Sequence, residues 1–116
     1  MSNYLVFDWG GTFMKYALMN EESEIIEKGK VPSPKKTDTL EYFLDVQDQI
    51  VSKYPDIAGI AISSPGIIDS SKGIIHVVGV FPYLQEIKLT DLLSERYGVP
   101  VAIENDGKAA ALAEVW

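Results

Sequence analysis

Near the start of the chain, an acid, two glycines and a threonine follow a short apolar run, in the stretch FDWGGTFMK over residues 7–15. A tight glycine turn between two strands leaves backbone N–H groups free to face an anion. Thr12 adds a hydroxyl, and Asp8 could hold a divalent cation directly or through water. This combination suits nucleotide phosphates with Mg²⁺. From these residues alone, a plain β-hairpin closed by Gly10 and Gly11 is equally well supported.

A second acidic stretch, Glu104-Asn105-Asp106, lies between an expected buried strand and an expected helix. A carboxylate there could act as a general base that takes a proton from a substrate hydroxyl. Asn and Asp are also favoured at helix N-caps, and taken alone this capping role is the better supported. The two roles are compatible, with Asn105 capping the helix and Asp106 reaching into a cleft.

The loop over residues 63–69, SSPGIID, follows another expected strand. It is either a simple turn or a substrate loop in which Gly66 allows the backbone to approach a ligand. His76 is the only histidine and lies in an apolar run, so a packed or surface imidazole is favoured over a catalytic one. Trp9 and Trp116 are expected to be packing residues.

Two common nucleotide-binding motifs are absent. No G-x-G-x-x-G follows a strand, which excludes the dinucleotide fingerprint. Gly29-Lys30 and Gly107-Lys108 lack the other residues of a P-loop. A nucleotide site therefore depends on the turn over residues 8–12.

The apolar pattern predicts an α/β fold with a mixed sheet. We expect an antiparallel meander, then helices alternating with parallel strands, and ligands at the carboxyl ends of the strands. A capping box of Asp38 and Glu41 should start the first helix, Thr90 should cap the second, and Gly98 should end it. The expected strands are 4–8, 14–19, 25–31, 57–63, 73–78 and 99–103, and the expected helices are 38–54, 91–97 and 106–116.

Composition narrows the functional classes. The chain has 116 residues, 47% of them hydrophobic, which is enough for one domain with its own core. It has no cysteine, so neither a disulfide framework nor a thiolate metal site is possible within it. A net charge of −7 argues against binding nucleic acid. Without a signal peptide or an apolar run of spanning length, a soluble cytoplasmic protein with no membrane contact is expected.

Three stretches together resemble the ROK family of sugar kinases and sugar-responsive repressors. They are FDWGGTFMK (7–15), IAISSPGIID (60–69) and VAIENDGKAAALAE (101–114). The resemblance implies an actin-like, ribonuclease H-like ATPase fold with a five-stranded mixed sheet. It also implies ATP-dependent phosphorylation of a sugar hydroxyl, as in a glucokinase-like hexose kinase. The implied roles are Mg²⁺ held through water by Asp8, ATP phosphates bound by Gly10, Gly11, Thr12 and Lys15, sugar contacts from Gly66 and Asn105, and Asp106 as catalytic base.

The resemblance has three departures. The chain matches the family's N-terminal lobe only. We therefore expect residues 1–116 to be one lobe of a two-lobed kinase and to be inactive alone, and we expect the full-length form to be a homodimer. Val80 stands where family kinases often carry a sugar-binding Asn. Lys108 replaces a small polar residue and is expected to be a solvated charge. Because no DNA-binding module precedes the first strand, a kinase is favoured over the alternative, a non-catalytic sugar sensor or transcriptional regulator.

Overall fold

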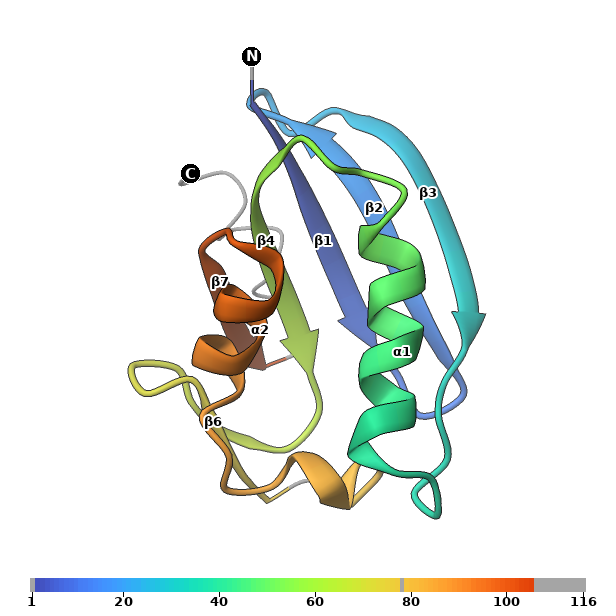
Figure 1. Cartoon of the computed structure of the whole chain (residues 1–116), viewed down its shortest axis with the longest axis vertical. Coiled ribbons are helices and arrows are strands. Elements are labelled where there is room, and N and C mark those ends of the chain that lie inside the picture. The colour runs from blue at the N-terminus through green and yellow to red at the C-terminus, as the bar shows by residue number, and fades with distance from the viewer. Residues whose placement is uncertain (1, 78, 106–116) are drawn as a thin grey trace.

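The computed structural model describes residues 2–77 and 79–105, which form a mixed sheet with helices on one face (Figure 1). The five strands lie in the order β3-β2-β1-β4-β7, and β5 and β6 form a separate two-stranded sheet. β1, β2 and β3 are an antiparallel meander, and β4 and β7 run parallel to β1. The elements are β1 (Asn3–Trp9), β2 (Phe13–Asn20), β3 (Ile25–Pro32), α1 (Leu40–Val51), β4 (Ile57–Ser64), β5 (Ile67–Asp69), β6 (Ile74–Val77), the 3₁₀ turn η1 (Pro82–Leu84), α2 (Leu89–Tyr97) and β7 (Val101–Asn105).

This architecture confirms the predicted fold class, a five-stranded sheet that joins a meander to parallel strands. The expected helix over residues 106–116, with Lys108 and Trp116, lies outside the described residues. Among the described residues, no helix is both long and apolar enough to cross a membrane.

The helix starts differ from prediction. Thr39, not Asp38, caps α1, because its side chain accepts a hydrogen bond from the Tyr42 N–H. The Asp38 carboxylate instead accepts from the Lys35 N–H at 2.7 Å. α1 also ends at Val51 rather than near Tyr54. The predicted capping box is therefore wrong by one residue.

Helix α2 starts without any side-chain cap. The backbone carbonyl of Gly73 accepts hydrogen bonds from the N–H groups of Leu89 at 2.9 Å and Thr90 at 3.3 Å. Thr90 therefore lies inside the first turn of α2 and is not its N-cap. The carbonyl of Gly73, between β5 and β6, satisfies the first N–H groups of the helix in place of a side-chain cap. Gly98 ends α2 in the left-handed conformation, with φ of 70°, as predicted.

The core lies between the sheet and the two helices. Alternate residues of β1, namely Leu5, Phe7 and Trp9, are buried on the helix-facing side of the sheet. Phe43 of α1 packs edge-on against Trp9, with ring centroids 4.9 Å apart. Trp9 is thus a packing residue, as predicted, and it is the last residue of β1 before the predicted phosphate-binding turn.

Candidate functional site

The turn over residues 10–12 joins β1 to β2 at the carboxyl end of β1. It is closed by a hydrogen bond from the Gly10 N–H to the Phe13 carbonyl at 3.0 Å, so this amide is not free to bind an anion. The N–H groups of Gly11 and Thr12, by contrast, make no hydrogen bond within residues 2–77 and 79–105. The expectation of free amides is therefore correct for two residues of the turn and wrong for Gly10.

Glycine is required at position 10 by close packing rather than by an unusual φ. A Cβ built there would lie 2.8 Å from the Phe13 carbonyl oxygen, which the turn itself holds in place. At Gly11 the nearest atom to such a Cβ is Cγ1 of Val80, at 3.4 Å. The side chain of Val80, in the loop that follows β6, therefore lies next to the turn.

Ser33, just after β3, holds the turn from outside the hairpin. Its N–H donates to the Thr12 carbonyl at 2.9 Å, and its hydroxyl donates to the Gly10 carbonyl at 2.5 Å. Both carbonyls are thereby engaged on one side of the turn. Ser33 could not be identified from the sequence, because nothing near it in the chain indicates which backbone groups it meets.

Gln47 of α1 contacts both strands that enter the turn. It is 1% exposed, and its Oε1 accepts a hydrogen bond from the Trp9 indole at 3.3 Å. Its Nε2 contacts the Met14 sulfur at 3.1 Å. Trp9 and Met14 are directly paired across β1 and β2 on either side of the turn. One buried amide therefore fixes both strands where they enter the turn.

A row of polar side chains crosses the sheet beside the turn. Asp8 is paired with Lys15 on one side and with Ser63 on the other. The pairing continues from Lys15 to Lys30 and from Ser63 to Glu104. Directly paired residues project to the same face of a sheet, and this face is opposite the one that carries Phe7 and Trp9. Asp8, Lys15 and Lys30 are exposed, whereas Ser63 is 4% exposed.

Asp8 suits a Mg²⁺ ion held together with phosphates. Its carboxylate is exposed and forms no ion pair within the described part of the chain. The same part contains no cluster of three or more His, Cys, Asp or Glu residues that could hold a metal. Mg²⁺ usually keeps several waters and is bound by one or two carboxylates plus substrate phosphates. A single exposed carboxylate beside two free amides fits that mode better than an all-protein cage.

The other predicted residues lie at the same end of the sheet. Gly66 follows β4 with φ of 112°, a conformation that favours glycine, as expected for a sharply bent loop. Asn105 ends β7 and is paired with Ser64 of β4. Asp106 lies outside the described residues. His76 is exposed by 42% and pairs with Glu86 through Nδ1 at 3.0 Å, which agrees with a surface imidazole.

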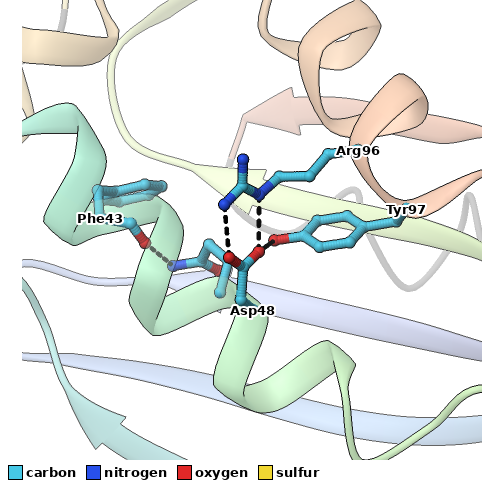
Figure 2. Close-up of polar contacts among 5 residues, drawn as sticks. Phe43, Asp48, Arg96 and Tyr97 are labelled. Carbon is cyan, nitrogen blue, oxygen red and sulfur yellow. Dashed lines mark hydrogen bonds and ion pairs between the residues drawn. The ribbon is translucent and has the colours of Figure 1, made fainter.

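A clamp of Asp48, Arg96 and Tyr97 joins α1 to α2 (Figure 2). Arg96 binds the Asp48 carboxylate in a bidentate manner, with Nε to Oδ1 at 2.7 Å and Nη2 to Oδ2 at 2.5 Å. The Tyr97 hydroxyl donates to Oδ1 at 2.7 Å. The hydrogen bond from Arg96 holds the pKa of Asp48 below its usual value of 3.8. Burial is the main cause that raises the pKa of Tyr97, and the hydrogen bond to Asp48 is the second.

The chain is similar in sequence and in fold to several known proteins. The chain is 33% identical to the beta-glucoside kinase of Listeria innocua over 95% of its length, and it spans 37% of that relative. The Lmo2764 protein of Listeria monocytogenes superposes with a TM-score of 0.83 at 31% identity, over 98% of this chain and 38% of that one. A ROK family glucokinase of Streptomyces griseus, solved with glucose and AMPPNP, gives 0.79 at 27% identity, over 95% and 35%.

These structures share the actin-like fold of ROK sugar kinases, as the resemblance implied. The chain covers little more than a third of the length of the relatives it matches. The model of the ROK family matches residues 4–116, which is nearly the whole sequence. The chain belongs to the ROK family.

Proposed function

We propose that this chain is the N-terminal lobe of an ATP-dependent sugar kinase. The observation that carries the proposal is the exposed Asp8 carboxylate beside the two unbonded amides of Gly11 and Thr12. In this proposal Mg²⁺ is held by Asp8 through water, and the turn lines the β- and γ-phosphates. When bound, Mg²⁺ neutralises phosphate charge, which is the main requirement of phosphoryl transfer.

The proposed acceptor is a hydroxyl of a hexose or of a hexoside. Asn105 hydrogen-bonds the sugar, Gly66 lies in the loop beside it, and Asp106 takes the hydroxyl proton. The proposal draws support from the names of the relatives, a beta-glucoside kinase and a glucokinase crystallised with glucose. Val80, whose side chain lies next to Gly11, stands where family kinases often carry a sugar-binding Asn.

The second lobe, in this proposal, closes the cleft over the nucleotide and excludes water. Residues 1–116 alone should therefore bind ATP weakly and give no turnover. The test therefore uses the whole protein, where both lobes are present.

The test is Asp106→Asn in the whole protein, assayed by ADP release against a panel of hexoses and β-glucosides. Loss of a general base should lower kcat by roughly 10²–10⁴-fold while ATP binding stays nearly unchanged. A variant with unaltered kcat refutes the assignment of Asp106. A ligand-induced rise in Tm with no turnover on any sugar would instead identify a sensor, the alternative that Val80 raises.

A further inference from the structure

The peptide unit between Gly10 and Gly11 carries one of the two amides that the predicted phosphate turn leaves unbonded. Its carbonyl belongs to Gly10, and its N–H is that of Gly11, which makes no hydrogen bond within residues 2–77 and 79–105. Every peptide bond in this part of the chain is trans. The carbonyl and the N–H of the unit therefore point in opposite directions. Whatever holds the Gly10 carbonyl also sets the direction of the Gly11 amide.

The two glycines themselves hold this peptide weakly. Glycine lacks a Cβ and reaches a wide range of φ and ψ, so a peptide between two glycines can turn over at little steric cost. A larger residue at position 10 would restrict it, but a Cβ there would lie 2.8 Å from the Phe13 carbonyl oxygen. In the reversed orientation a carbonyl, rather than an N–H, would face a bound anion. The turn therefore needs a contact from outside it.

The Ser33 side chain makes that contact. Its hydroxyl donates a hydrogen bond to the Gly10 carbonyl at 2.5 Å, across 23 residues of sequence. The Gly10 carbonyl therefore points towards Ser33, and the Gly11 N–H points away from it. Turning the peptide over would break this hydrogen bond. One hydroxyl thus favours the orientation in which the amide is available to a ligand.

Continuation of the sheet explains only the backbone contact of Ser33. Its N–H donates to the Thr12 carbonyl at 2.9 Å, which extends the pairing of β2 with β3 beyond Pro32. Any residue except proline could supply that N–H. The hydrogen bond to the Gly10 carbonyl, by contrast, requires a side-chain donor at position 33. The hydroxyl therefore has a role that strand pairing does not provide.

Ser33 is itself held in place by its neighbours. It lies between Pro32 and the buried Pro34. The ring of Pro32 fixes its own φ, and a residue before proline is restricted to extended conformations. Just beyond, the Lys35 carbonyl accepts a hydrogen bond from the Tyr83 hydroxyl at 3.3 Å. The segment is thus tied to η1 as well as to the turn, so the hydroxyl is presented from a restrained backbone.

We propose that Ser33 is a positioning residue whose hydroxyl keeps the Gly10–Gly11 peptide in the orientation that presents the Gly11 N–H to a nucleotide phosphate. The inference rests on the proposed function, because it takes ATP as the ligand of the turn. Without the hydroxyl both orientations are populated, and ATP binds only one of them. The apparent affinity then falls in proportion to the competent fraction, whereas saturating ATP restores the competent orientation.

The kinetic test compares Ser33→Ala, Ser33→Thr and the unmodified whole protein. Ser33→Ala should raise KM for ATP roughly 2- to 12-fold, the range that one hydrogen bond of ordinary net strength supports. The value of kcat and the KM for the sugar should stay unchanged, and Ser33→Thr, which keeps the hydroxyl, should restore KM for ATP. The matched control is Ser52→Ala, which removes another hydroxyl bond to a backbone carbonyl, that of Gln49 at 3.1 Å, and should leave KM unchanged.

A second measurement needs neither nucleotide nor sugar. Relaxation-dispersion nuclear magnetic resonance of the chain should show microsecond-to-millisecond exchange at the Gly11 amide in Ser33→Ala. The unmodified chain, Ser33→Thr and Ser52→Ala should show none there.

An unaltered KM for ATP in Ser33→Ala overturns the inference, as does a Ser33→Thr variant that is equally impaired. An equal rise in the KM for the sugar also overturns it, because the effect would then be a general loss of structure. Absence of exchange at Gly11 in Ser33→Ala overturns it without reference to catalysis. Failure here is therefore distinguishable from failure of the proposed kinase activity.

Discussion

The buried amide of Gln47 offers a direct test of how the turn is held in place. The substitution Gln47→Leu keeps a similar volume but removes the acceptor of the Trp9 indole N–H, which is bonded at 3.3 Å. Trp9 is 1% exposed, so water cannot replace that acceptor. The indole N–H would be left buried and unpaired.

The cost follows from that lost partner. Leaving a buried donor unsatisfied costs about 1–3 kcal/mol, and the apolar leucine offsets part of it, which favours the lower half of the range. For a chain of 116 residues, the unfolding entropy makes each kcal/mol worth about 4 °C in Tm. Gln47→Leu should therefore lower Tm by about 4–8 °C.

The assay is thermal unfolding followed by circular dichroism, with Gln49→Leu as matched control. Gln49 is on the same helix but exposed, so the same change there should stay within about 0.5 kcal/mol. Hydrogen exchange at the Gly10 amide, which closes the turn, should become faster only in Gln47→Leu. Equal melting of the two variants, or a more stable Gln47→Leu, would refute the view that this amide positions the turn.

Two further predictions concern the contacts that support the helices. Because the folded-state pKa of Asp48 lies below 3.8, the clamp contributes fully above that pH and is lost as pH falls through the folded-state value. Asp48→Asn should therefore cost about 0.2–1 kcal/mol at pH 7, and the difference should vanish in urea titrations once the pH falls below the folded-state pKa of Asp48; a pH-independent difference contradicts it. Gly73→Ala puts a Cβ 1.7 Å from Thr90 Oγ1 at a φ of +67°. Backbone strain at this φ alone should lower the free energy of unfolding by about 1–3 kcal/mol, and the clash adds to it. Gly79→Ala, with nothing within 4 Å, is its control, and equal urea midpoints for the two would show that the hairpin tolerates the extra atom.

The sequence predicts best what depends on local pattern. Alternation and glycine placement identify the meander, the turn after Asp8 and the left-handed end of α2 at Gly98. These features depend on residues near one another in the chain, where period and turn chemistry act directly. The shift of the α1 cap from Asp38 to Thr39 shows the limit of such signals, because both residues are good caps.

Contacts between distant segments were not predictable in the same way. The short strand β5 was expected to be loop, since Ile67–Asp69 becomes a strand only by pairing with β6. Lys30 joins the polar row only through its register with Lys15. Gln47 did carry a signal: it lies on the apolar face of α1, between Phe43 and Ile50, where a polar residue needs a buried partner.

The polar row also suggests how the proposed reaction divides the site. Lys30 and Lys15 stand on the β3 and β2 side of Asp8, while Ser63 and Glu104 stand on the β4 and β7 side. Cations attract phosphate, and a carboxylate accepts a hydrogen bond from a neutral hydroxyl. In the proposed reaction, the nucleotide therefore lies on the β3 and β2 side of Asp8, and the sugar lies on the β4 and β7 side. Asp8 lies between them, where a Mg²⁺ ion would offset its charge against the incoming phosphates. On this view, reversing the sign at Lys15 should weaken nucleotide binding, whereas changes at Glu104 should alter the apparent KM for the sugar.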